Sequence, residues 1–223
     1  MVMNQFLSSA EAARSLGVND SRVRQLARQG RLPSQKVGSR WLIEARAVSR
    51  RRPRPSGRPL SPSSAWALLL LASGEEPQVT NSRARRRLAK RLASLPKEAE
   101  RLSVRAESRW FRADERALAD LRKDPDFIRS GVSVSEEYGV DIQAPNVVEG
   151  YYPQHKLDRF SYRYALRPVS EEVANLIVHS VGGRFPLAGR TRVPAPVAAL
   201  DLLESHDERT RRAGAKLLRE LTP

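Results

Sequence analysis

The 223-residue chain contains no cysteine, which excludes disulfides and thiolate-ligated metal sites. Its three histidines, His155, His179 and His206, are far apart and show no repeated ligand spacing. The longest apolar run, residues 65–72, is well short of the roughly 20 residues that a membrane-spanning helix needs. The first residues do not combine a basic region with an apolar core, as a secretion signal does. We therefore expect a soluble, cytoplasmic protein that binds no membrane.

Signatures of catalysis are also lacking. No Ser/His/Asp arrangement and no glycine-rich phosphate loop stands out. His179 lies in an apolar run, which favours a hydrogen-bonded core histidine over a metal ligand. Asp141, Glu149 and Asp158 could hold a metal, but salt bridges to nearby arginines are the simpler interpretation. The sequence therefore predicts a protein that is not an enzyme and that needs no cofactor or metal.

Acidic residues are scarce near the N-terminus. The whole chain has 40 Lys and Arg against 25 Asp and Glu, a net charge of +15. Residues 1–60 contain 13 basic and 3 acidic side chains, residues 61–130 contain 15 and 10, and residues 131–223 contain 12 of each. A positive charge concentrated in one part of the chain predicts nucleic acid as the partner of that part.

Residues 20–29 predict a short helix with two different faces. Asn19 can cap its first turn, and Gly30 can end it in a left-handed conformation. The apolar face consists of Val23, Leu26 and Ala27, and the opposite face consists of Ser21, Arg22, Arg24, Gln25 and Arg28. Arg and Gln form bidentate hydrogen bonds with guanine and adenine edges, and Ser and Arg also suit phosphates. This helix is therefore predicted to enter the major groove of DNA.

A supporting helix precedes this one. Ser8 followed by Glu11 is a capping-box signature, and apolar residues then recur at helical spacing up to Gly17. Residues 17–19 alone would join the two helices, which is the tight connection of a helix-turn-helix. After Pro33, two strand-like runs predict a hairpin, or wing. Its tip is predicted to present Lys36, Gly38, Ser39 and Arg40.

The order S-x-x-E-A-A-x-x-L-G-V, a basic helix, G-R-L-P and K-V-G-x-R-W-x-I resembles the winged helix-turn-helix of the excisionase and MerR-like DNA-binding families. The resemblance covers residues 6–50, and residues 1–50 are accordingly expected to form one domain. It implies that residues 22–28 enter the major groove while residues 38–40 approach the neighbouring minor groove or the backbone.

Residues 51–60, RRPRPSGRPL, read as a linker from their proline content and as a DNA arm from their charge. Residues 57–59 reproduce the Gly-Arg-Pro core of an AT-hook, but Ser56 stands where such hooks usually have a basic residue. An ordinary basic linker is therefore favoured over a specific minor-groove reader. In both cases each contacted phosphate would steepen the salt dependence by about 0.9 log units. The predicted phosphate contacts are Arg51, Arg52, Arg54 and Arg58.

Residues 61–223 are expected to form an α+β domain that is helical over residues 61–125. Ser61 and Pro62 begin an apolar helix that Gly74 ends. A strongly basic helix over residues 81–95 has a surface that suits phosphate, an acidic protein or plain solvation. Helical periodicity then continues over residues 97–112, and Asp114 can cap a further helix.

From residue 126 the pattern predicts an antiparallel sheet followed by two helices. The expected strands, residues 147–152, 159–166 and 175–181, are rich in Val, Ile, Tyr and Phe. In residues 159–166 aromatic and polar side chains alternate, as in a half-buried antiparallel strand. The final helices are expected over residues 197–205 and 207–221.

A sheet followed by V-P-A-P-V-A-A-L-D-L-L-E-S-H-D-E-R-T-R-R-A-G-A-K-L-L resembles the end of antitoxins of the abortive-infection AbiEi type, over residues 126–223. Such antitoxins join a winged DNA-binding domain to an antitoxicity domain, repress their own operon, and are encoded beside a nucleotidyltransferase-like toxin. The resemblance implies a transcriptional repressor and antitoxin with a cognate toxin protein as its partner.

On DNA, a homodimer is expected, because one short helix reads few base pairs and two half-sites about 34 Å apart give useful specificity. Two alternatives remain open. One is an excisionase-type recombination directionality factor, although those are usually little more than the DNA-reading domain. The other is an adaptor whose basic half binds RNA.

Overall fold

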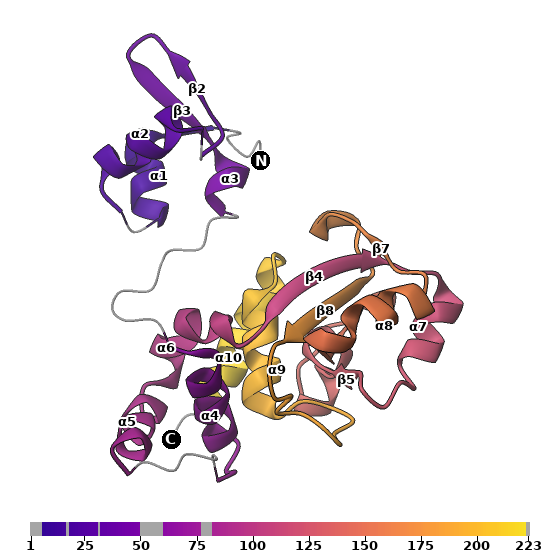
Figure 1. Ribbon diagram of the computed structural model, residues 1–223. Coiled ribbons are helices and arrows are strands. Elements are labelled where there is room, and N and C mark those ends of the chain that lie inside the picture. Colours follow the sequence, from indigo (N-terminus) through magenta and orange to yellow (C-terminus); the bar gives the residue numbers. More distant parts are fainter. Residues whose placement is uncertain (1–5, 17, 31, 50–59, 77–81, 222–223) are drawn as a thin grey trace. The chain divides into compact units, whose positions relative to one another are not determined.

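The computed structural model describes residues 6–16, 18–30, 32–49, 60–76 and 82–221 (Figure 1). The chain divides into two compact units, Met1–Arg58 and Pro59–Pro223. Within the described residues, every helix is too short or too polar to cross a membrane. The α+β fold class is confirmed, with a helix-turn-helix in the first unit and a helix-covered sheet in the second.

The described residues of the first unit form three helices and a small antiparallel sheet. Its elements are β1 (Phe6–Ser8), α1 (Ser9–Leu16), α2 (Asp20–Arg28), β2 (Ser34–Val37), β3 (Arg40–Glu44) and α3 (Ala45–Ser49). Strand β3 is central and pairs with β1 and β2, so the predicted wing is the β2–β3 hairpin. The two helices that the sequence predicts are confirmed, whereas β1 and α3 are additional. The core consists of Ala12, Ala13, Leu16, Val23, Leu26, Ala27, Leu32, Ile43 and Val48.

The second unit opens with helices α4 (Pro62–Ala72), α5 (Ser82–Leu92) and α6 (Leu95–Leu102). The Ser61 side chain accepts a hydrogen bond from the Ser64 amide, which makes it the N-cap of α4 as predicted. Trp66, Leu68 and Leu69 of α4 are buried. An apolar helix of this kind has to be covered by the rest of its domain, and here α5, α6 and a later helix near the C-terminus cover it.

The prediction of helix over residues 97–112 is wrong beyond residue 102. After α6 the chain forms a 3-10 turn, η1 (Ser103–Arg105), and then strand β4 (Glu107–Arg112). The helical middle segment therefore contains a strand. Apolar residues do recur at four-residue intervals here, but the backbone of β4 pairs antiparallel with a strand more than 60 residues away, with Trp110 opposite Ile177.

The sheet of the second unit has the order β5-β6-β8-β4-β7. Besides β4, its strands are β5 (Ile128–Arg129), β6 (Val148–Pro153), β7 (Arg167–Pro168) and β8 (Leu176–Val181). Strands β6 and β8 are parallel and the other described pairs are antiparallel, so the sheet is mixed and not antiparallel as predicted. Every residue of β6 is buried, which is typical of a parallel strand covered on both faces.

The predicted strand over residues 159–166 is instead helix α8 (Leu157–Arg163) and the turn that follows it. Parallel neighbours need a crossover connection, and α8 lies in the crossover from β6 to β8. Phe160 and Tyr164, four residues apart, are buried on one side, whereas Tyr162 is 91% exposed. The aromatic alternation therefore reflects one helical face and one solvated tyrosine.

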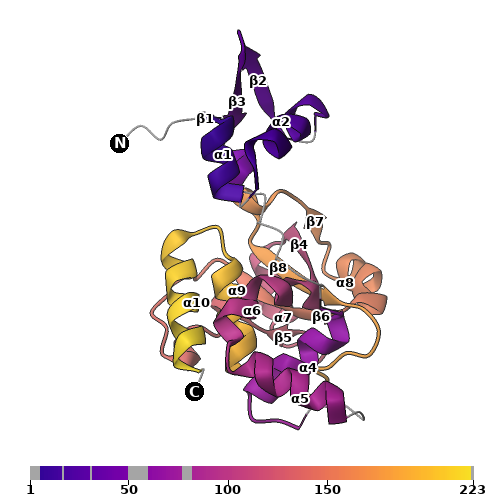
Figure 2. The ribbon, with the colours of Figure 1, turned by 90° about the vertical axis from the view of Figure 1, so that its left-hand side faces the viewer.

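Helices cover both faces of this sheet (Figures 1 and 2). Helices α7 (Glu115–Leu121) and α8 pack on one face, and α4, α6, α9 (Ala195–Glu204) and α10 (Glu208–Glu220) pack on the other. Because successive side chains of a strand point to opposite faces, Tyr151 joins the core beneath α9 and Tyr152 joins the core beneath α8. The two terminal helices are confirmed.

Candidate nucleic-acid interface

Helix α2 is fixed at both ends by the residues that the sequence indicated. The Asn19 side-chain oxygen accepts a hydrogen bond from the Arg22 amide at 2.8 Å. Gly30, at φ +65°, donates its amide hydrogen to the Ala27 carbonyl. Such a positive φ is accessible to glycine at little cost, so the helix ends sharply there.

The outer face of α2 gathers the predicted contact residues. All five are exposed: Ser21, Arg22, Arg24, Gln25 and Arg28. Arg22 Nη1 donates to Gln25 Oε1 at 2.6 Å, which places a guanidinium and a carboxamide side by side. This leaves the Gln25 amide nitrogen and further Arg22 N–H groups to donate outward. The pair therefore offers several aligned donors at one point of the helix.

Arg24 forms an ion pair with Asp20, one turn earlier in α2. The Arg24 side chain is 46% exposed and the Asp20 side chain 36%. Exposed pairs of this spacing contribute about 0.3–0.5 kcal/mol, so a phosphate or a base edge can replace the carboxylate at small cost. Asp20 thus orients Arg24 without blocking it.

Helix α1 packs against the apolar side of α2, opposite its basic face. The Ser8 hydroxyl accepts from the Glu11 amide at 3.2 Å, and the Ser8 amide donates to the Glu11 carboxylate at 2.8 Å, which confirms the capping box. The Ser8 hydroxyl donates to the Glu11 carboxylate at 2.7 Å, and this bond, together with the one from the Ser8 amide, lowers the pKa of Glu11. Ala12, Ala13 and Leu16 of α1 belong to the same core as the buried side of α2. The basic side of α2 therefore faces outward.

The wing presents its predicted residues at an exposed tip. Val37 pairs with Arg40 across a two-residue turn made of Gly38 and Ser39. Gly38 has φ +59° and occupies the turn position at which two-residue hairpins favour glycine. The exposed residues are Lys36, Val37, Gly38, Ser39 and Arg40. The remaining predicted contacts, Arg51, Arg52, Arg54 and Arg58, lie outside the described residues.

A family model described as a helix-turn-helix domain matches residues 6–51. Residues 6–51 are a helix-turn-helix domain. A domain of this kind implies DNA binding, and α1 and α2 form its helix-turn-helix motif. Comparison with curated proteins and with solved structures finds no match. The resemblance of residues 126–223 to AbiEi-type antitoxins has no support from these comparisons.

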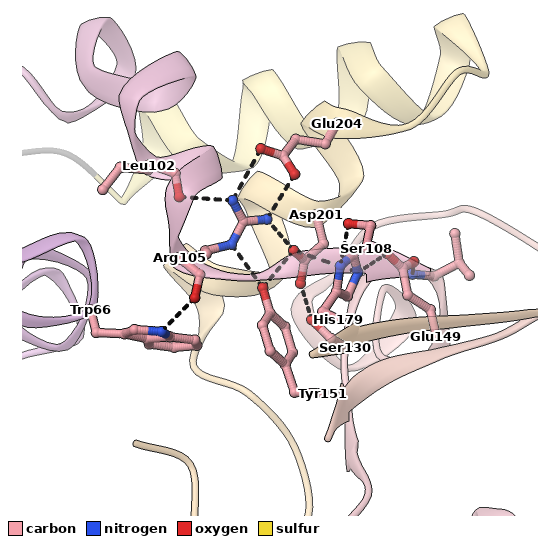
Figure 3. Close-up of polar contacts among 11 residues, drawn as sticks. Trp66, Leu102, Arg105, Ser108, Ser130, Glu149, Tyr151, His179, Asp201 and Glu204 are labelled. Carbon is pink, nitrogen blue, oxygen red and sulfur yellow. Dashed lines mark hydrogen bonds and ion pairs between the residues drawn. The ribbon is translucent and has the colours of Figure 1, made fainter. Parts of the chain in front are cut away.

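Outside the helix-turn-helix domain, a cluster of charged side chains is buried in the second unit (Figure 3). Arg105, at the end of η1, is 2% exposed and makes five hydrogen bonds. Its acceptors are the Leu102 carbonyl, the Tyr151 hydroxyl, Asp201 and both carboxylate oxygens of Glu204. A guanidinium has five N–H groups, so its donor capacity is matched.

His179 on β8 extends this cluster. Its Nδ1 lies 2.9 Å from Ser108 Oγ, and its Nε2 lies 2.8 Å from Glu149 Oε1 and 3.8 Å from Asp201 Oδ1. Burial lowers the pKa of His179, but the carboxylates of Asp201 and Glu149 outweigh this effect and raise it above its ordinary value. Both contacts suit the protonated ring, which can donate to Glu149 and to Ser108.

Glu149, His179 and Asp201 have donor atoms within 4.8 Å of one another, a set that can ligate a divalent cation. In this structure the carboxylates of Glu149 and Asp201 both accept hydrogen bonds from protein donors. Asp201 accepts from Arg105, Tyr151 and Ser130, and Glu149 accepts from His179 and the Val132 amide. The cluster thus acts as an ion network that ties η1, β6, β8 and α9 together.

The sequence predicted part of this network. A hydrogen-bonded core histidine at position 179 is confirmed, but Glu149 pairs with that histidine and not with an arginine. Arg105 and Asp201 were missed. A signal for Asp201 was present, because a carboxylate in the middle of an apolar helix must find a buried partner.

Proposed function

We propose that the protein is a sequence-specific transcriptional regulator that binds an operator in duplex DNA through α2 and the wing. The observation that carries the proposal is the exposed row of Arg22, Arg24 and Gln25 on a helix capped at both ends and anchored by its apolar side. Arg and Gln read base edges in the major groove. Ser21, Arg28, Lys36 and Arg40 would hold the phosphates on either side.

The second unit favours a regulator over an excisionase-type factor. An excisionase-type factor needs little beyond the DNA-reading domain, whereas the second unit has two hydrophobic clusters and its own buried ion network. A unit of that size is suited to a second task, such as binding a protein. Within the proposal, the narrower role is an antitoxin that represses its own operon and opposes a nucleotidyltransferase-like toxin, as the resemblance of residues 126–223 implies.

The operator proposal is tested with a duplex that the protein itself selects from a random pool. Affinity is measured for that duplex and for a scrambled duplex of equal length. Arg22→Ala combined with Arg24→Ala is expected to cost about 1–3 kcal/mol for each lost base contact on the selected duplex and much less on the scrambled one. Equal losses on the two duplexes would show that these arginines touch only phosphate.

Arg14→Ala is the matched control, because Arg14 is an exposed arginine on α1 of the same domain. It removes one positive charge without altering the α2 face, so the preference for the selected duplex should persist. The antitoxin role has a separate test, which is growth of cells that express the neighbouring gene with and without this protein. Toxicity that the protein does not relieve contradicts the antitoxin role and leaves the operator proposal intact.

A further inference from the structure

Helix α5 holds the whole excess of positive charge of the second unit. Its 11 residues, Ser82–Leu92, include six basic side chains and no acidic one. Residues 61–223 contain 27 basic and 22 acidic side chains, but 21 and 22 once α5 is left out. Such a concentration on one helix is not what general solubility requires, since charges that only solvate a surface are spread over it.

Two of the basic side chains of α5 form ion pairs that the structure shows within the protein. Arg85 pairs with Glu76 at 3.0 Å and Arg91 pairs with Glu98 at 2.7 Å. Leu88 is buried and anchors the helix against its neighbours. Three further basic side chains, Arg86, Arg87 and Lys90, are exposed and form no ion pair with any residue that the structure describes.

Helix α10 shows what an ordinary solvated face looks like in this chain. There Arg212 pairs with Glu208, and Lys216 lies 3.8 Å from Glu220, each one turn apart. In α5, by contrast, Lys90 lies three residues from Arg87 and four from Arg86. Like charges at these spacings destabilise a helix, so this face is unfavourable in the free protein. A bound polyanion would remove that repulsion.

We propose that Arg86, Arg87 and Lys90 form a second DNA contact, which binds backbone phosphates of the duplex that flanks the sequence read by α2. This inference rests on the proposed function. Lys and Arg bind phosphates without regard to sequence and release counterions as they do so. Once the helix-turn-helix domain holds the operator, flanking phosphates are present at high effective concentration, which favours duplex DNA over an unrelated acidic protein.

The test compares the wild-type chain with the triple variant Arg86→Ala, Arg87→Ala, Lys90→Ala. The probes are the selected duplex trimmed to its operator and the same duplex extended on both sides by unrelated sequence. The dissociation constant is measured over a range of salt concentrations. On the extended duplex the slope of log K against log salt should become shallower by about 0.9 for each lost phosphate contact, so by up to about 2.7. On the trimmed duplex the two proteins should bind alike.

The control variant is Arg116→Ala, Arg122→Ala, Lys123→Ala. These three side chains are also exposed and lie among Asp114, Glu115 and Asp120 in and near α7. Replacing them removes as many positive charges as the α5 variant does. The control should keep the wild-type slope. Thermal unfolding should show the α5 variant to be at least as stable as the wild type, because alanine favours helix and the repulsion is gone.

An α5 variant that keeps the wild-type slope on the extended duplex overturns the inference, as does a control variant that loses the slope equally. If the α5 variant no longer binds a protein that the wild type binds, while its salt dependence on the extended duplex is unchanged, α5 is a protein-binding surface and the inference is overturned. A random pool that yields no enriched sequence contradicts the proposed function instead. In that case the slope on any long duplex still decides whether α5 binds phosphate.

Discussion

Arg105 shows how a single residue can join distant segments. Its hydrogen bonds link η1 to Tyr151 on β6 and to Asp201 and Glu204 on α9, and all of its N–H groups are used. Removing one member of a buried ion pair leaves the other charge without compensation, which is more costly than the net value of the pair. The contribution of this side chain can therefore be measured by truncating it.

We expect Arg105→Met to lower the free energy of unfolding by about 3–5 kcal/mol, because it removes the guanidinium that pairs with the buried Asp201 carboxylate. Urea unfolding followed by tryptophan fluorescence measures this. Arg209→Met is the control, since Arg209 and Asp141 are both largely exposed and their pair should contribute less than about 1 kcal/mol. Similar effects of the two variants would show that the buried network does not stabilise the unit.

The raised pKa of His179 predicts a pH dependence of stability. The folded protein holds the proton more tightly than the unfolded chain does, because Asp201 and Glu149 face the ring. The stabilisation is therefore fully present below the pKa of the unfolded histidine, about 6.5, and is lost as the pH rises through the higher folded pKa. Urea unfolding of the wild type from pH 6 upward should show this loss.

His179→Gln should be less stable than the wild type at pH 6 and should lose less stability as the pH rises. The control is His206→Gln, because His206 is 53% exposed and contacts Glu171 at the surface. It should keep the wild-type pH profile. If His179→Gln retains that profile as well, the dependence does not arise from His179.

At the scale of elements, helices α9 and α10 pack closely around a glycine. A Cβ at Gly214 of α10 would lie 2.4 Å from the Leu203 amide nitrogen and 2.7 Å from the Ala199 carbonyl oxygen, both backbone atoms of α9. Glycine is a poor helix former, with a cost of about 1 kcal/mol relative to alanine. Its presence in the middle of α10 is explained by this close approach to α9.

Gly214→Ala is accordingly expected to destabilise the second unit by about 1–3 kcal/mol, although alanine has the higher helix propensity, because α10 must move away from α9. Thermal and urea unfolding measure the change. Arg212→Ala on the exposed side of the same helix removes a surface ion pair and should change stability by less than about 1 kcal/mol. A Gly214→Ala variant more stable than the wild type would refute the packing argument.

At the scale of the whole molecule, the two units have separate cores. Substitutions on the α2 face should therefore leave the unfolding of the second unit unchanged, including its dependence on the pH. The small size of the α2 face sets a second expectation. One helix of nine residues reads few base pairs, so we expect specific binding to involve two copies on DNA.

We expect two chains per operator, bound to half-sites about 34 Å apart. The stoichiometry can be measured by sedimentation of the protein with the selected duplex. Scrambling one half-site should reduce the affinity sharply, while inserting five base pairs between the half-sites should place them on opposite sides of the duplex and have a similar effect. A one-to-one complex whose affinity is indifferent to the second half-site would rule out the homodimer.

Local signals determined much of this protein. Ser8, Asn19, Ser61 and Asp114 each cap the helix that their position predicts, and Gly38 turns the wing. These features depend on neighbouring residues in the chain, so the sequence displays them directly. The exposed basic face of α2 follows from the same local periodicity. The α+β class and the terminal helices were predictable for this reason.

Tertiary structure alone decided the rest. Residues 107–112 became a strand because β8 supplies hydrogen-bond partners from distant sequence, and residues 157–163 became a helix because parallel β6 and β8 need a crossover. The ion network likewise joins Arg105 to Asp201 across 96 positions of the chain. Interactions between residues so far apart leave little trace in local periodicity, since they depend on which faces the folded sheet brings together.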